Sequence, residues 1–138
     1  MKETEIDLLE WLPIISRNYT MTLDQQLLKI GLNSSLYYYV IKLYEFGDLP
    51  QEKLVRLTGV NASNVTRAVQ KLIHSGLVTK KENPDDRRGF LLSLTTDGRT
   101  LYPQILDSLE KVTADFLAPL SPQQKDIFVQ SLSLLRSH

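Results

Sequence analysis

The residues whose types and spacing suit chemistry lie in two short runs in the middle of the 138-residue chain. The first, "ASNVTRAVQK" at 62–71, brings hydroxyl, amide, guanidinium and ammonium groups close together. The second, "NPDDRRG" at 83–89, sets two aspartates directly before two arginines. Hydroxyl, amide and guanidinium groups can bond to the edges of nucleic-acid bases, and cations attract phosphate. Both runs therefore indicate binding to a polyanion.

The titratable residues give little support to catalysis or metal binding. Asp85 and Asp86 are neighbours at an expected turn, where two carboxylates seldom converge as a glycosidase pair must. His74 and His138 lie far apart in the sequence, and a zinc site built from them alone is unsupported. Since the chain has no cysteine, thiolate nucleophiles, disulfides and thiolate metal sites are excluded. We find no glycine-rich phosphate loop and no nucleophile elbow, and we expect no enzyme activity, no metal and no cofactor.

The charged residues are unevenly distributed, although the formal net charge is zero. Residues 1–49 hold four basic and seven acidic side chains, residues 50–100 hold nine and five, and residues 101–138 hold three and four. The middle segment is therefore basic and lies between acidic flanks. Because salt screens charges beyond about 8–10 Å, attraction to phosphate depends on this local charge more than on the net charge.

Two short helices joined by a tight turn are expected to position the first run. Pro50 should open one helix and Gly59 should close it, while Asn61 should cap the next, which closes at Gly76. The inward side of the second helix would hold Val65, Val69, Leu72 and Ile73. Its outer side would hold the candidate DNA-contacting residues Ser63, Asn64, Thr66, Arg67, Gln70 and Lys71. This arrangement is a helix-turn-helix pattern, in which the second helix is the recognition helix.

A β-hairpin is expected to position the second run. "LVTKKE" and "RRGFLLSLT" flank the turn "NPDD", and Phe90, Leu92 and Leu94 alternate with Leu91, Ser93 and Thr95. A hairpin directly after a helix-turn-helix is a wing, and arginine is the usual side chain placed in a narrow minor groove. The candidate DNA-contacting residues of the wing are Lys80, Asp86, Arg87 and Arg88, with Asp86 holding either the arginine or the turn. The alternative is an ordinary exposed turn, whose ion pairs contribute about 0–1 kcal/mol.

The remaining segments are predicted to form helices. Apolar residues at helical spacing predict a first helix that Pro13 bends or delays and Gly31 ends. Thr95 or Thr96 should cap a long helix after the hairpin, with Leu101, Ile105, Leu109, Val112 and Phe116 inward. Pro119 and Pro122 bracket a turn before a final helix.

The helix expected to be capped by Asn33 or Ser34 and to stop at Gly47 carries three consecutive tyrosines. Its predicted apolar face consists of Leu36, Tyr37, Val40, Ile41 and Tyr44. This spacing directs Tyr37 inward and Tyr38 outward. We take both as candidate lining of a ligand pocket.

These elements, taken in order, resemble the winged helix-turn-helix of MarR-family bacterial transcriptional regulators. Asp86-Arg87-Arg88 matches the family's D-x-R at the wing, and Leu94-Thr95 with Gly98 matches its L-T-x-x-G. The stretch 64–78 matches the usual recognition helix and the "GLV" that leads into the wing. The flanking helices also fit, so the likeness covers essentially the whole chain.

The resemblance implies a mainly α fold with a small β-hairpin wing. It implies a single MarR-like domain over 1–138, with dimerisation helices at 1–32 and 101–138 and the DNA-binding region at 33–100. Such proteins are homodimers that bind palindromic operators on double-stranded DNA, usually repress, and often release DNA when a small aromatic ligand binds. Arg88 matches the family's inserting arginine. The peroxide-sensing cysteine of one branch is absent from this chain.

A second hypothesis keeps the winged helix but makes it a protein-interaction module, because a fold does not dictate function. Such a module would expose apolar residues on the recognition helix, whereas this face is polar and cationic. No segment resembles a signal peptide or is apolar enough to span a bilayer. We therefore expect a cytoplasmic protein with no membrane partner.

Overall fold

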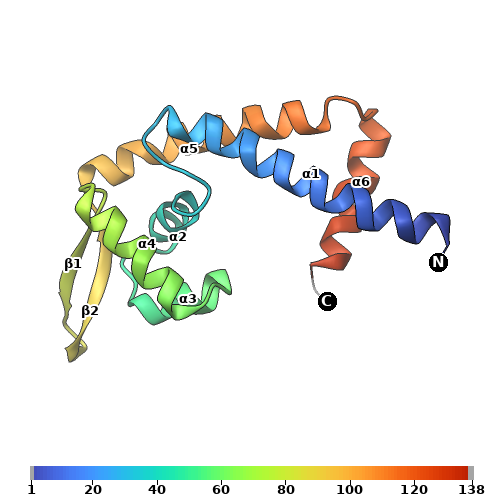
Figure 1. The fold of residues 1–138 in the computed structure, drawn as a ribbon. Helices are drawn as coiled ribbons and strands as arrows, with labels where there is room; N and C mark the ends of the chain where they lie inside the picture. Colours follow the sequence, from blue (N-terminus) through green and yellow to red (C-terminus); the bar gives the residue numbers. More distant parts are fainter. Residues whose placement is uncertain (1, 137–138) are drawn as a thin grey trace.

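The chain folds into helices and one hairpin, as shown by a computed structural model that describes residues 2–136 (Figure 1). Met1, Ser137 and His138 lie outside the described residues, and with them the outer ends of the ranges 1–32 and 101–138. The described elements are α1 (Glu3–Leu28), α2 (Tyr37–Phe46), α3 (Gln51–Thr58), α4 (Ala62–His74), β1 (Val78–Asn83), β2 (Asp86–Leu94), α5 (Thr96–Leu117) and α6 (Pro122–Leu135). The predicted fold class, mainly α with a two-stranded antiparallel wing, is confirmed.

The elements form a lobe and an arm (Figure 1). The lobe contains α2, α3, α4 and the hairpin, and the arm consists of α1 and α5 side by side with α6 at the end away from the hairpin. The hydrophobic core lies mainly in the lobe, where it is completed by the last turns of α1 and by α5. The largest fully buried apolar side chains are Leu27, Leu32, Leu54, Leu72, Leu92 and Ile105. This packing supports α4 from beneath and leaves its outer side free.

The start of α2 differs from the sequence prediction. The helix begins at Tyr37 with Leu36 at the N-cap position, and not Asn33 or Ser34, because side-chain hydrogen bonds hold the preceding residues in a turn. Asn33 Oδ1 accepts from the backbone N–H of Ser35 at 2.9 Å, and Asp24 Oδ1 accepts from the backbone N–H of Ser34 at 2.6 Å. Asparagine side chains commonly stabilise turns in this way. Pro13, in turn, lies inside α1 and does not delay its start.

The buried face of α2 is also rotated from the predicted one. Tyr39, Val40 and Leu43 are buried, whereas Tyr44 is 48% exposed. The predicted inward position of Tyr44 is therefore wrong, because α2 contacts α3, β2 and α5 and these neighbours cover a different arc of the helix. Tyr44 instead stacks on Tyr102 of α5, with ring centroids 3.7 Å apart.

The hairpin departs from simple alternation along β2. Phe90 is 56% exposed, while Leu92, Ser93 and Leu94 are all buried, Ser93 at 1% exposure. The predicted alternation is wrong at this strand because its base is covered on both sides, whereas its outer half projects from the lobe. Leu49 adds two backbone hydrogen bonds to Leu92, at 3.1 and 2.7 Å, and so extends the sheet at its base.

Thr95 joins the hairpin to α5 and to the end of α4. Its hydroxyl accepts from the backbone N–H of Gly98 at 3.1 Å and donates to the carbonyl of Gly76 at 2.6 Å, which confirms Thr95 as the cap of α5. Its own N–H donates to the carbonyl of Leu77 at 3.0 Å. A Cβ at position 98 would lie 2.3 Å from the Leu77 carbonyl oxygen, so the close approach requires glycine. The L-T-x-x-G stretch thus fixes the wing beside the recognition helix.

No described helix combines the length and the apolar character that a membrane span needs.

Candidate nucleic-acid interface

The recognition helix α4 has a cap, a buried side and a polar side. Asn61 caps it as predicted, its Oδ1 accepting from the backbone N–H of Asn64 at 2.9 Å. The buried residues are Val65, Ala68, Val69 and Leu72, so Ile73 is less buried than predicted and Ala68 belongs to the core. Among the candidate DNA-contacting residues, Ser63, Asn64, Arg67, Gln70 and Lys71 are exposed and Thr66 is half-buried. The helix therefore presents donors, acceptors and two cations on its outer side.

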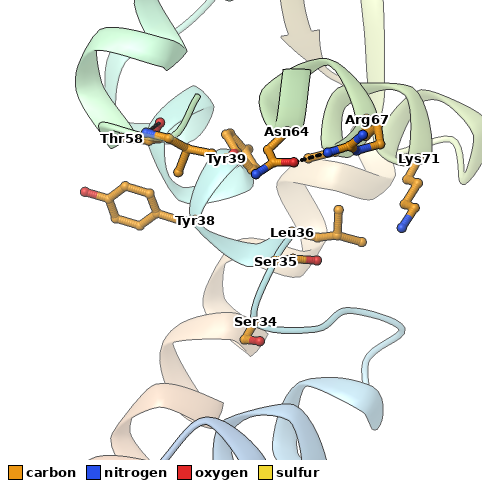
Figure 2. Close-up of a pocket in the computed structure, with 11 residues that line it drawn as sticks. Ser34, Ser35, Leu36, Tyr38, Tyr39, Thr58, Asn64, Arg67 and Lys71 are labelled. Atoms are coloured by element: carbon orange, nitrogen blue, oxygen red, sulfur yellow. Dashed lines mark hydrogen bonds between the residues drawn. The ribbon is translucent and has the colours of Figure 1, made fainter. Parts of the chain in front are cut away.

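Neighbouring groups already hold two of these polar side chains in place. The guanidinium of Arg67 donates to the side-chain oxygen of Asn64, one turn earlier on the same helix (Figure 2). The Thr66 hydroxyl donates to the carbonyl of Ala62 at 2.9 Å and accepts from Gln51 Nε2 of α3 at 2.8 Å. Gln51 is a site residue that sequence reasoning missed, because helical periodicity does not show which polar side chain of α3 reaches α4.

The tip of the wing carries a bulge. Glu82 pairs with Phe90 and the next residue, Asn83, pairs with Asp86, so Arg87, Arg88 and Gly89 have no cross-strand partner. Extra residues in one strand bend it and redirect its side chains. Both arginines are exposed, and neither guanidinium group forms an ion pair or a hydrogen bond within residues 2–136. The bulge therefore displays two free guanidinium groups at the end of the hairpin.

Asp86 holds the turn and not a guanidinium. Its Oδ1 accepts from the backbone N–H of Arg88 at 3.0 Å, which settles the two alternatives raised by the sequence in favour of the turn. On the other side of the tip, Asn83 Oδ1 accepts from the backbone N–H of Asp85 at 3.0 Å. These bonds shape the backbone on which Arg87 and Arg88 are carried.

The two lysines of β1 have different surroundings. Lys81 pairs with Asp48 of the α2–α3 loop at 3.6 Å, whereas the Lys80 ammonium lies 5.8 Å from the centre of the Phe90 ring. Lys80 also lines an open hollow of about 570 Å³ between α4 and β1, together with Gln70, Ile73, His74 and Thr79. The structure thus brings Gln70 of the recognition helix and Lys80 of the wing to one surface.

A second hollow lies between the start of α2 and α4, and we call it the α2–α4 pocket (Figure 2). It has a volume of about 420 Å³. Its lining consists of Ser34, Ser35, Leu36, Tyr38, Tyr39, Thr58, Val60, Asn64, Arg67, Ala68 and Lys71. Tyr38 lines this pocket but Tyr37 does not. Burial raises the pKa of the Tyr37 hydroxyl, and the nearby Tyr19 and Tyr38 add to that rise.

A large apolar surface lies on the arm, away from α4 and the wing. The exposed apolar side chains there include Leu8, Leu9, Trp11, Leu12, Ile127, Val129, Leu132, Leu134 and Leu135. A groove of about 440 Å³ runs between α1, α5 and α6, and within its lining the Phe116 ring contacts the rings of both Tyr19 and Phe128. Exposed apolar side chains in such numbers are typical of protein–protein interfaces. Within residues 2–136, no three His, Asp or Glu side chains are grouped as metal ligands would be.

Comparison with known proteins agrees with this geometry. The MarR family model matches residues 32–90. YdgJ of Bacillus subtilis, an uncharacterized HTH-type transcriptional regulator, is 24% identical over 108 residues, which are 78% of this chain and 66%, just under two thirds, of that relative. A probable transcriptional regulator from Pseudomonas aeruginosa is similar in structure, with a TM-score of 0.83, 29% identity, and coverage of 90% of this chain and 92% of the other. A mutant E. coli MarR complexed with operator DNA has a TM-score of 0.85 at 18% identity, covering 96% and 95% of the two chains.

Proposed function

Because this chain belongs to the MarR family of winged-helix transcriptional regulators, we propose that it binds a specific operator on double-stranded DNA as a homodimer and represses transcription. One observation carries the proposal: the exposed polar face of α4 lies beside a wing whose bulge displays two unpaired arginines. A protein-interaction module is disfavoured, because the outer side of α4 offers hydroxyl, amide and charged groups and no large apolar side chain.

In this function α4 enters the major groove. Arg67 is the principal base reader, since a guanidinium can donate two bonds to one guanine, and Asn64 orients it. Ser63 and Thr66 lie in the same turn and contact neighbouring bases. Gln70 and Lys71 lie one turn further along and contact phosphates.

The wing contacts the adjacent minor groove. Arg88 enters the groove, where a narrow width concentrates negative potential, and Arg87 and Lys80 approach the phosphate backbone. Asp86 contributes by holding the backbone of Arg88 in the bulge. The five cations proposed to contact DNA, Arg67, Lys71, Lys80, Arg87 and Arg88, are all exposed.

The arm mediates dimerisation. We assign this role to residues 1–32 and 101–138 and DNA binding to residues 33–100, within one domain over 1–138. The exposed apolar side chains of α1 and α6 support the assignment, because a second copy of the chain would remove them from water. A two-fold dimer presents two recognition helices and so matches a palindromic operator whose half-sites lie about 34–36 Å apart.

A small aromatic ligand can regulate such a dimer only by binding its two states unequally. The α2–α4 pocket is the proposed binding place, with Tyr38 offering a ring face. Arg67 and Lys71 line the same pocket and also face the proposed DNA, so a ligand there would change how α4 meets the operator. Tyr37 would act only indirectly, through its neighbour Tyr38.

The test is a fluorescence-anisotropy titration of the purified protein against DNA fragments that flank its own gene, at two salt concentrations. Tight binding to one fragment, weakened by salt and by Arg67→Ala, is the expected result. Equal weak binding to every fragment would contradict recognition of an operator beside its own gene, and no binding even at low salt would favour the protein-interaction hypothesis. A reporter gene behind the bound fragment then tests repression, which requires higher expression when the protein is absent.

A further inference from the structure

An exposed aromatic ring lies beside one of the cations of the wing. Phe90 is 56% exposed, and the centre of its ring lies 5.8 Å from the Lys80 ammonium. A cation within about 6 Å of a ring centre is attracted by the negative charge of the ring face. Phe90 does not belong to the hydrophobic core, so burial does not account for a phenylalanine at this position.

The register of the hairpin brings these two side chains together. Lys80 pairs with Leu92 and Glu82 pairs with Phe90, so Lys80 and Phe90 are diagonal neighbours on one face of the sheet. At this diagonal spacing aromatic and long side chains can reach each other. Leu92 is buried at the base of the hairpin, whereas Lys80 and Phe90 are exposed. The strand pairing therefore places the ring where the lysine can use it.

The ring leaves the charge of Lys80 available, in contrast to that of the next lysine. Lys81 is paired with the Asp48 carboxylate at 3.6 Å, so an opposite charge offsets its own. Within residues 2–136 no carboxylate lies at ion-pair distance from Lys80, and the ring beside it is neutral. An ammonium group has three N–H donors, and one ring face does not occupy all of them. Lys80 can therefore keep its ring contact while it donates to a phosphate.

Lys80 also belongs to a surface shared with the recognition helix. It lines the hollow of about 570 Å³ between α4 and β1, together with Gln70. We propose that Phe90 is a positioning residue, whose ring holds the Lys80 ammonium at this hollow ready for a DNA phosphate. The inference rests on the proposed function, in which Gln70 and Lys80 contact the phosphate backbone. Phe90 acts through Lys80 and does not itself need to touch DNA.

The benefit to binding comes from ordering the lysine in advance. A lysine side chain has many rotamers, and fixing such a side chain on association lowers affinity by about two- to tenfold. The ring restricts these rotamers before DNA arrives, so part of that loss is avoided. Because the ring carries no charge, its removal should change the affinity without changing the number of phosphates that are neutralised.

The experiment uses the full chain and its operator. Anisotropy titrations at several salt concentrations compare the wild type with Phe90→Leu, Lys80→Gln and the double variant. Leucine keeps an apolar side chain without a ring, whereas Phe90→Tyr keeps the ring. Phe46→Leu is the matched control, because Phe46 is 54% exposed and its ring centre lies 5.7 Å from the Lys42 ammonium. Phe46 is the last residue of α2 and is not among the residues proposed to contact DNA.

Phe90→Leu should lower operator affinity by about two- to tenfold and leave the salt slope unchanged. Lys80→Gln should lower the salt slope by about one, because a phosphate contact is lost. In the Lys80→Gln background, Phe90→Leu should have no further effect, since both act through one ammonium group. Phe90→Tyr and Phe46→Leu should bind as tightly as the wild type.

Unchanged operator affinity in Phe90→Leu would overturn the inference. So would an equal loss in the wild-type and Lys80→Gln backgrounds, which would mean that the ring contacts DNA directly or supports the fold of the wing. A lower salt slope in Phe90→Leu, or an equally large loss in Phe90→Tyr or Phe46→Leu, would also contradict it.

These results concern only Phe90, since operator binding by the wild type would still support the proposed function. Absence of any sequence-specific binding by the wild type would instead contradict the proposed function, and the role of Phe90 with it.

Discussion

The carboxylate of Asp86 accepts the backbone N–H of Arg88 at 3.0 Å, across the bulge at the end of the wing. This bond joins the acidic and basic members of the D-x-R stretch through the main chain. The aspartate thereby shapes the turn while leaving the arginine side chain free to reach a partner. Both residues are exposed, so the effect of changing either should fall on binding more than on folding.

Asp86→Ala should weaken operator binding by several-fold and change thermal stability little. The lost bond is worth about 0.5–1.5 kcal/mol and orders only the bulge. Asp85→Ala is the matched control, because Asp85 contributes its backbone N–H and not its carboxylate to the turn. Anisotropy titrations of the two variants compare them directly, and equal losses of affinity would argue against a specific role for the Asp86 carboxylate.

Arg88→Ala should reduce operator affinity by roughly ten- to hundredfold, the range of a charge-assisted hydrogen bond worth about 1.5–3 kcal/mol. The oligomeric state, measured by sedimentation, should stay as in the wild type, because the tip of the wing lies away from α1 and α6. Loss of dimer together with loss of binding would refute the assignment of the wing to DNA contact.

Arg67→Ala and Lys71→Ala should weaken DNA binding in different ways. Loss of Arg67 should reduce discrimination at one guanine by about 1–3 kcal/mol, whereas loss of Lys71 should weaken binding to all sequences and lower the salt slope by about one. Titrations of operator and unrelated DNA at several salt concentrations separate the two outcomes. Identical behaviour of the two variants would contradict the division between base reading and phosphate contact.

Gly98→Ala should destabilise the fold by about 1–3 kcal/mol, the usual effect of forcing an extra methyl into a packed site. Its Cβ would lie 2.3 Å from the carbonyl oxygen of Leu77, which is backbone and cannot turn aside. Gly89→Ala serves as the control, because a Cβ there would make only an ordinary contact of 3.6 Å with Asp86 Oδ2. Urea unfolding of both variants gives the comparison, and similar midpoints would show that the junction tolerates a side chain.

Leu132→Glu should convert the proposed dimer to a monomer and abolish the proposed tight operator binding. Leu132 lines the groove of the arm, where a charge would have to lose its water on association. Gln130→Glu, an exposed change on the same helix outside that lining, should leave the dimer intact. Sedimentation at micromolar concentration distinguishes them, and a stable dimer of Leu132→Glu would exclude this groove from the interface.

Local signals in the sequence were sufficient to predict where several helices begin or end. Asn61 caps α4 as predicted, Thr95 is the one of the two predicted candidates that caps α5, and Gly59 closes α3 with φ of 69°. In each case the deciding hydrogen bond or dihedral angle involves residues within a few positions of each other, so a short stretch of sequence contains the whole cause.

Features that depend on distant neighbours were not predictable in the same way. Ser93 is buried and Phe90 exposed because surrounding elements cover only the base of β2. Gln51 of α3 donates a hydrogen bond to Thr66 of α4, and the apolar periodicity within either helix does not predict a contact between them. The proposed site could thus be outlined from residue types, whereas the contacts that orient its side chains required the fold.

The bonds of Thr95 have a mechanical consequence. One residue fastens the end of the recognition helix, the base of the wing and the first turn of α5 to a common point. The outer side of α4 and the wing, which are proposed to contact the major and minor grooves, are therefore anchored at the same residue. In the proposed dimer, a signal that acts through the arm would move α4 and the wing of each subunit together. It would then control DNA binding through the distance between the two α4 helices.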